Sequence, residues 1–277
     1  MTPLVFTFIA FSISLGAGFL GSLLGLGGGI IVIPALTLWL HIDIRYAIGA
    51  SIVSVIATSS GAAATYVRQR LANLRVAMVL ELATVLGAIS GAYLAGQLAG
   101  RWLYLTFAGI MAYSAAMMFR RTSDVPAVRR APWADHLKLH SSYHDDKLGH
   151  EVLYRVAGTR IGLVLMYLAG AISGLLGIGS GVLKVPAMDL AMGLPIKVST
   201  ATSNLMIGVT AAASAGVYFV RGDIDPFVAA PVALGVMLGA LAGSRVMGRI
   251  PAATLRMVFV VVVLVVATQM LWKGIHL

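Results

Sequence analysis

Two glycine clusters, each followed by a proline, are the residues of this chain whose types and spacing best suit binding chemistry. The first cluster lies at 24–29 and leads to Pro34, and the second lies at 176–181 and leads to Pro186. A glycine break exposes the first backbone N–H groups of the next helix, and these donors attract anions together with the helix dipole. The alternative is close helix packing, in which small residues are common. The predicted binding residues are Gly27, Gly28, Gly29, Gly179, Ser180 and Gly181.

Hydroxyl and amide side chains follow each cluster. Ser51 and Ser203 occupy matching places downstream of the two clusters, and Asn204 comes directly after Ser203. These groups could coordinate an oxyanion. They could equally form interhelical hydrogen bonds that hold a helix bundle together.

Three ionisable residues interrupt apolar segments, namely Glu81, Lys184 and Asp189. Such residues are costly in lipid and are functional candidates by default. Lys184 lies two positions before Pro186, where it could attract an anion, or it could form a salt bridge with Asp189 or Glu81. Titration of Glu81 or Asp189 could couple anion movement to a proton, so both are coupling candidates.

The composition places these residues in a membrane. The hydrophobic fraction is 59% and the charged fraction 11%, against roughly 25% charge in a soluble domain. Apolar runs such as 71–98 and 257–272 fit spans of roughly 20 residues, and the alternation of a β-barrel is absent. We therefore predict an all-α polytopic membrane protein. The first Lys or Arg is Arg45, so residues 4–22 are expected to be a retained span rather than a signal peptide.

The remaining composition excludes several function classes. The chain has no cysteine, which rules out disulfides and cysteine metal sites. The net charge of +10 sits mostly in loops and indicates orientation by the positive-inside rule. Nucleic-acid binding is a poor alternative, because no basic helix stands free of the membrane. No cofactor is expected.

The chain is duplicated. A constant offset of 152 residues relates Gly25 to Gly177 and continues without a gap over most of each half. Such a register indicates two repeats, at 1–119 and 158–277, joined by a connector at 120–157. Further pairs at this offset are Pro34 and Pro186, Ser51 and Ser203, Thr58 and Thr210, Tyr66 and Tyr218, Gly87 and Gly239, Gly91 and Gly243, Gly96 and Gly248, and Leu103 and Leu255.

Each half divides into five predicted membrane segments. They are about 3–23, 29–40, 46–68, 74–98 and 101–119 in the first half, and about 158–176, 181–193, 198–220, 226–248 and 252–272 in the second. The segments after the glycine clusters would rise only about 18 Å as helices. We expect about eight full transmembrane helices plus two short broken or re-entrant helices.

The loop charges predict that the two repeats have inverted topology. Arg68, Arg70 and Arg75 crowd one loop, which we place in the cytoplasm. The matching loop at 221–225 is not basic, whereas the next loop, at 245–256, carries three arginines. The loop that is rich in arginine therefore comes one loop later in the second half than in the first. This arrangement places both termini outside and the connector 120–157 in the cytoplasm.

The connector contains His136, His140 and His144, whose spacing of four would align them for a metal on a helix. However, Leu148-Gly149 resembles a turn, and the residues that follow alternate as in a strand. A small β-hairpin would scatter the histidines, and we predict a solvated loop with no metal.

The two glycine–proline motifs, together with the run Lys-Val-Ser-Thr-Ala-Thr-Ser-Asn at 197–204, resemble the TauE/SafE sulfite exporter family. The resemblance covers nearly the whole chain, and Ser180 departs from the more usual glycine. It implies a secondary transporter of the cell membrane that exports small sulfur-containing anions, such as sulfite, sulfoacetate or taurine-derived sulfonates.

Two other functions compete with a carrier. An anion channel is hard to separate from a carrier by sequence, although paired broken helices in inverted repeats favour alternating access. An intramembrane enzyme would need a nucleophile–base pair, a metal set or paired carboxylates. The apolar segments contain no histidine and few acidic residues, so we do not expect an enzyme.

Overall fold

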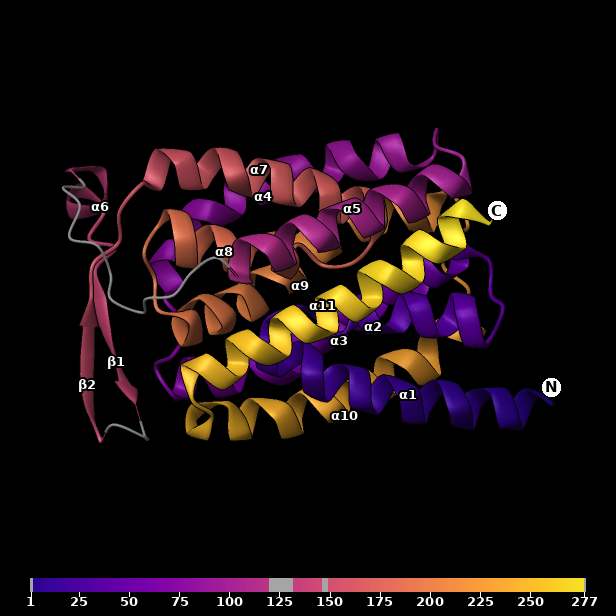
Figure 1. The fold of residues 1–277 in the computed structure, drawn as a ribbon, viewed down its shortest axis with the longest axis horizontal. Helices are drawn as coiled ribbons and strands as arrows, with labels where there is room; N and C mark the ends of the chain where they lie inside the picture. The colour runs from indigo at the N-terminus through magenta and orange to yellow at the C-terminus, as the bar shows by residue number, and fades with distance from the viewer. Residues whose placement is uncertain (1, 120–131, 146–148, 277) are drawn as a thin grey trace.

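Long helices form a bundle with a small hairpin at one end (Figure 1). The computed structural model describes residues 2–119, 132–145 and 149–276. Within this part, seven helices are long and apolar enough to cross a membrane, and α5 is an eighth long helix. The prediction of an all-α polytopic membrane protein is confirmed. The long helices are α1 (Pro3–Leu24), α3 (Ile44–Arg68), α4 (Leu74–Ala95), α5 (Gly100–Phe119), α7 (Thr159–Leu176), α9 (Ile196–Val220), α10 (Pro226–Val246) and α11 (Ala252–Ile275).

Two short helical segments follow α1 and α7. Helix α2 (Gly29–Pro34) continues into the π-helix η1 (Ala35–Trp39), and α8 (Gly181–Pro186) continues into η2 (Ala187–Ala191). Each proline lies where the α-helix changes to a π-helix. Proline has no backbone N–H and cannot complete the α-helical ladder, which accounts for the change at this point.

The helices of each half pack mainly against helices of the other half. Helix α1 packs along α10, and α4 packs along α7. The offset of 152 residues relates α1 to α7 and α4 to α10, so the two contacts are equivalent. Further large contacts join α3 to α10 and α9 to α4, which the offset also relates, and α3 to α9 and α5 to α11, which are pairs of equivalent helices. Each half therefore buries its apolar helices against the other half.

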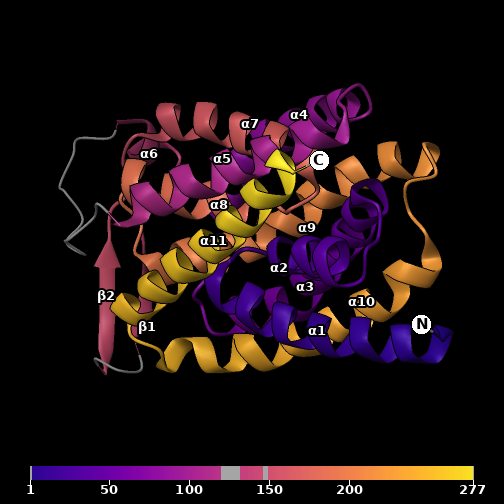
Figure 2. The ribbon, with the colours of Figure 1, turned by 45° about the vertical axis from the view of Figure 1, so that its right-hand side comes forward.

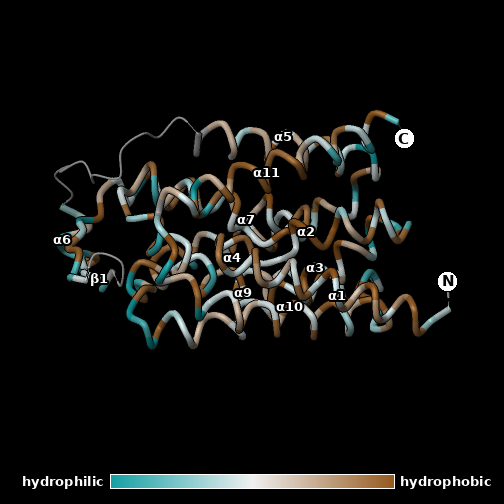
Figure 3. The backbone as a smooth tube through the Cα atoms, turned by 60° about the horizontal axis from the view of Figure 1, so that its bottom comes forward, coloured by the Kyte–Doolittle hydropathy of each residue, from teal (hydrophilic) through white to brown (hydrophobic). Residues whose placement is uncertain are grey.

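Helices α1 and α7, which the offset of 152 relates, begin at opposite ends of the bundle (Figures 1 and 2). Helix α1 begins and α11 ends at one end of the molecule, while α7 begins at the end that carries the hairpin (Figures 1 and 2). Hydrophilic stretches lie mainly toward the two ends of the helices (Figure 3). The predicted inverted topology requires related helices to begin at opposite ends. The inverted topology and the orientation of the bundle in a bilayer stay predictions.

The connector forms a small cap on one end of the bundle. It contains α6 (Pro132–His136) and an antiparallel hairpin of β1 (Ser141–Asp145) and β2 (His150–Tyr154), in which Tyr143 pairs with Val152. Leu148, which belongs to the predicted turn, lies outside the described residues. A short 3₁₀ turn, η3 (Met247–Arg249), joins α10 to α11.

Both ring nitrogens of His140 have protein partners. His140 Nδ1 accepts the Val156 N–H at 3.0 Å, and its Nε2 lies 2.7 Å from an Asp135 carboxylate oxygen. His136 ends α6, whereas His144 belongs to β1. Among residues 2–119, 132–145 and 149–276, no three metal-ligating side chains form a group.

Asn73 ties the connector to the bundle. Its side-chain Nδ2 donates to the Leu139 carbonyl and to the Tyr154 hydroxyl, both at 2.9 Å. Its Oδ1 accepts the Val76 N–H at 3.1 Å and so caps α4. Burial raises the pKa of Tyr154, which keeps the phenol neutral beside the amide.

Asn73→Ala should destabilise the protein more than Asp225→Ala does. Asp225 is the equivalent residue at the offset of 152, and its side chain caps α10 through the Phe227 N–H. Loss of a cap costs about 1 kcal/mol, and each further net hydrogen bond is worth about 1 kcal/mol. We expect losses of roughly 3 and 1 kcal/mol respectively, measured by denaturation in detergent. Equal losses would mean that the two connector contacts of Asn73 contribute nothing.

Candidate functional site at the two glycine breaks

Left-handed backbone conformations separate each short helix from the long helix before it. Gly25, Gly27 and Gly28 have φ angles of 70°, 78° and 63°, and Gly177 and Gly179 have φ angles of 64° and 65°. Side chains rarely tolerate these angles, so glycine is required there. Ser180 instead has a φ of −59°, which explains why serine is tolerated at that position.

The two breaks pack directly against each other. A Cβ atom on Gly181 would collide with the Gly25 carbonyl oxygen. A Cβ atom on Gly29 would collide with Ser51 Oγ and would lie 3.5 Å from the Gly177 carbonyl oxygen. The offset of 152 relates these two contacts. The first turns of α2 and α8 therefore lie close together in the protein interior.

Serines of the central helices hold the break carbonyls across the two halves. Ser51 Oγ of α3 donates to the Gly177 carbonyl at 2.6 Å, and Ser203 Oγ of α9 donates to the Gly25 carbonyl at 2.8 Å. Both serines are fully buried. The interhelical hydrogen bonds considered from the sequence are thus present, and each joins one repeat to the other.

Two buried polar atoms near the breaks have no hydrogen-bond partner within the described residues, namely Ser180 Oγ and Asn204 Oδ1. The Asn204 Nδ2 group donates to the Ser22 carbonyl at 2.7 Å and to the Thr200 carbonyl at 3.1 Å. Buried polar groups are nearly always paired. Each of the two atoms is therefore a candidate to bond a water molecule or a polar ligand.

Lys184 forms a buried polar cluster with Thr210 and Glu81. Its Nζ donates to Thr210 Oγ1 at 2.7 Å and lies 3.4 Å from Glu81 Oε2, while Thr210 Oγ1 donates to Glu81 Oε1 at 2.6 Å. The cluster joins α8, α9 and α4. The lysine side chain is fully buried, and that of Glu81 is 13% exposed. Of the two salt bridges considered from the sequence, Lys184 makes the one with Glu81.

Asp189 pairs with Arg256 rather than with Lys184. The Arg256 guanidinium lies 3.4 Å from Asp189 Oδ2. The offset of 152 relates Asp189 to Thr37 and Arg256 to Tyr104, which also interact with each other through their side chains. The second half thus carries an ion pair where the first half carries two neutral groups.

The structure divides the predicted site residues into three groups. The break residues lie together with Ser51, Ser203 and Asn204 in the interior. Lys184 of α8 and Glu81 of α4 belong to the buried cluster. Asp189 lies further along the chain, on η2. The sequence interpretation assigned no role to Thr210 or Arg256. Thr210 could have been noticed in the sequence because it is equivalent to Thr58 at the offset of 152. Arg256 was considered only as one of the three arginines of the loop at 245–256.

The chain matches the model of the Sulfite exporter TauE/SafE family over residues 10–270. The chain belongs to this family. The resemblance inferred from the glycine–proline motifs is confirmed. Because the family consists of membrane transporters and the helices are long and apolar, this TauE/SafE chain is a multi-pass membrane transporter.

Curated relatives agree with the TauE/SafE assignment. The chain is 25% identical to "Probable membrane transporter protein YunE" of Bacillus subtilis (strain 168), over 94% of this chain and 95% of the relative. It is 26% identical to "Probable membrane transporter protein YdhB" of the same strain, over 90% and 91%. A "Probable membrane transporter protein" of Xylella fastidiosa (strain 9a5c) is 26% identical, over 93% and 92%. No solved structure matches the chain significantly.

Proposed function

We propose that this protein is a secondary transporter that exports sulfite or a small organosulfonate through one central site built from both glycine breaks. The observation that carries the proposal is the contact between the breaks, where Gly181 abuts the Gly25 carbonyl. This contact brings the first turns of α2 and α8 to one place. A first helical turn leaves N–H groups without α-helical partners. Some of them already bond break carbonyls, as Ile31 does to Gly28 and Leu183 to Ser180, and the remaining N–H groups of both turns would be the donors to the anion.

The polar side chains around the breaks suit an oxyanion. Ser180 Oγ is buried without a partner among the described residues and can donate to an anion oxygen. Ser51 and Ser203 already donate to carbonyls, so they would position the two breaks rather than bind the anion directly. Asn204 Oδ1 is an acceptor, and it would suit the hydroxyl of a protonated anion such as hydrogensulfite.

The Lys184–Thr210–Glu81 cluster provides a means of coupling transport to protons. Ionised Glu81 neutralises Lys184 across 3.4 Å. Protonation of Glu81 would remove this partner and leave a buried cation, whose charge an anion would then balance. Proton binding and anion binding would therefore favour each other, so the anion would leave the cell together with a proton, driven by its own concentration gradient. Asp189 is a weaker coupling candidate, because it pairs with Arg256.

The decisive experiment is a flux assay in proteoliposomes that contain the purified protein. We expect saturable movement of sulfite or an organosulfonate, stimulated by a pH gradient, and little movement of carboxylates. The panel should include sulfite, sulfate, taurine, sulfoacetate and acetate. Failure of every sulfur-containing anion to move would overturn the proposed substrate class.

The same assay separates a carrier from a channel. A carrier exchanges labelled for unlabelled substrate, so unlabelled anion on the far side should accelerate the entry of labelled anion. A channel shows no such acceleration, because it has no alternating site. Unaccelerated, non-saturable flux would favour the channel.

A further inference from the structure

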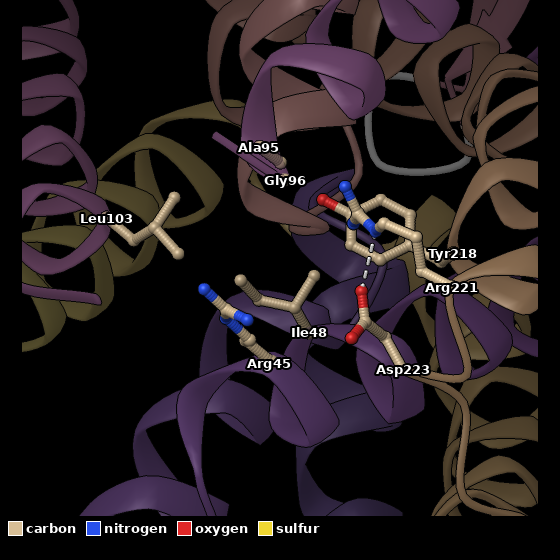
Figure 4. Close-up of a pocket in the computed structure, with 8 residues that line it drawn as sticks. All are labelled: Arg45, Ile48, Ala95, Gly96, Leu103, Tyr218, Arg221 and Asp223. Carbon is tan, nitrogen blue, oxygen red and sulfur yellow. Dashed lines mark hydrogen bonds and ion pairs between the residues drawn. The ribbon is translucent and has the colours of Figure 1, made fainter. Parts of the chain in front are cut away.

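A pocket of about 140 Å³ lies at the bundle end opposite the hairpin, where α3 and α5 begin and α4 and α9 end (Figure 4). A water molecule occupies roughly 30 Å³ of liquid, so the pocket can hold a small oxyanion. Its charged lining residues are Arg45, Arg221 and Asp223.

The pocket carries a surplus positive charge. Arg221 Nε donates to Asp223 Oδ2 at 2.8 Å, and another of its guanidinium nitrogens donates to the Ala92 carbonyl at 3.0 Å. Its guanidinium also stacks over the Tyr218 ring at 4.4 Å. Asp223 thus neutralises Arg221 and holds it rigidly.

Once Arg221 is paired with Asp223, the remaining positive charge of the pocket belongs to Arg45. Its side chain is exposed and has no hydrogen bond or ion pair with the residues that the structure describes. The nearby Asp43 carboxylate is engaged in capping α3 through the backbone N–H of Arg45, at 2.8 Å. Figure 4 shows the Arg45 guanidinium reaching into the space between Leu103 and the Arg221–Asp223 pair.

Two residues that line the pocket, Ile48 and Tyr218, also contact the region of the second glycine break. Ile48 lines the pocket, and a Cβ atom on Gly177 would meet the Ile48 side chain and lie 3.0 Å from its carbonyl oxygen. Tyr218 also lines the pocket, and its hydroxyl donates to the Gly174 carbonyl at 2.7 Å, at the end of α7. A layer of Ile48 and Tyr218 thus separates the pocket from the second break.

The equivalent positions at the hairpin end are closed. The offset of 152 relates Arg45 to Lys197, Ile48 to Thr200 and Tyr218 to Tyr66. The two tyrosines are equally buried, but Lys197 is only 2% exposed whereas Arg45 is exposed. A cation therefore occupies the same position in both repeats, exposed at one end of the bundle and buried at the other.

We propose that Arg45 and Arg221 form a peripheral binding site for the transported oxyanion, which passes from there to the second glycine break. Lys197 takes the place of Arg45 when the hairpin end opens. The inference rests on the proposed function, since it assigns an entry site to the same anion. Arg45 contributes the free charge, and Arg221 contributes fixed donors on the opposite wall.

The test compares Arg45→Gln with Arg101→Gln. Arg101 is exposed at the start of α5, at the same end of the bundle, but does not line the pocket. Loss of a charge-assisted contact to an anion should raise the KM for sulfite about tenfold in R45Q, with little change in maximal flux. R101Q should keep the KM of the unmodified protein. Equal KM values for the two variants, with flux intact, would overturn the proposal.

The absence of cysteine from the chain permits a charge-rescue experiment. In Arg45→Cys, alkylation with 2-bromoethylamine restores a cation through a thioether that sulfite does not cleave, whereas iodoacetamide adds a neutral group. Only the first reagent should restore the KM. Equal rescue by both reagents would show that side-chain bulk rather than charge matters, and would overturn the proposal.

A third measurement separates this inference from the proposed function. Ethanesulfonate should slow the alkylation of the single thiol introduced in Ala95→Cys, which lines the pocket and keeps Arg45, but not that of the thiol introduced in R101C, whether or not the protein carries flux. Protection without any flux of sulfur-containing anions would support the peripheral site and count against the proposed function. Flux of sulfur-containing anions without protection of the thiol would support the proposed function and overturn the peripheral site.

Discussion

Replacing Gly181 by alanine should abolish transport. The new Cβ atom would collide with the Gly25 carbonyl oxygen, which is a backbone atom that no rotamer change can move. Ser203 also donates to this carbonyl, so the two breaks would be forced apart. Overpacking of this kind costs about 1–3 kcal/mol, and displacement of binding groups by about 1 Å can lower a rate about 100-fold. The measurement is anion flux in proteoliposomes.

Gly216→Ala is the matched control. Gly216 lies in α9, and a Cβ atom there would meet no other group within 4 Å. Alanine favours a helix over glycine by about 1 kcal/mol, so G216A should be as stable and as active as the unmodified protein. Normal flux in G181A would contradict a site built from closely approaching breaks.

The second large effect concerns Lys184 and Glu81. Lys184→Met should destabilise the protein by about 3–5 kcal/mol, because it leaves the Glu81 carboxylate with no charged partner in a largely buried position. Glu81→Gln should destabilise it similarly by isolating the buried ammonium group. Replacing both partners removes both charges, so E81Q/K184M should recover most of the stability. Denaturation in detergent measures each effect.

Transport should not recover with stability. The double variant lacks both the Glu81 carboxylate and the Lys184 cation, so we expect flux at background and no response to a pH gradient. Recovery of gradient-driven flux in the double variant would reduce the ion pair to a structural role. A variant of Thr210, such as Thr210→Val, should retain the ion pair but lose the hydroxyl that joins Lys184 to Glu81.

The sequence predicted the helices and their interruptions well. Long apolar runs and glycine clusters are local features, so the bounds of helices such as α3 and α9 agree with the predicted segments within a few residues. Each short α-helix ends at its proline and continues as a π-helix, although the chain could equally have continued from there as a loop. Periodicity could not distinguish these outcomes, because the sequence pattern of a short apolar helix does not fix its hydrogen bonding.

The contacts between distant segments could not be predicted in the same way. Lys184 had two possible partners in the sequence, and only the packing of α4 against α9 brings Glu81 within 3.4 Å. The pocket at Arg45 likewise depends on four helix ends meeting. The offset of 152 did carry information about such contacts, since Ser51 and Ser203 make equivalent bonds.

The packing of each half against the other has a consequence for biosynthesis. The Gly25 carbonyl accepts a bond from Ser203, a residue 178 positions later in the chain. An unpaired carbonyl is costly in lipid, and in a chain that inserts during its synthesis the first half reaches the membrane before Ser203 is translated. In the nascent first half, the Gly25 carbonyl therefore lacks its Ser203 partner. Water or the insertion machinery has to supply a hydrogen bond until the second half is present. Contacts of such long sequence separation form slowly, so the final assembly step belongs to the second half.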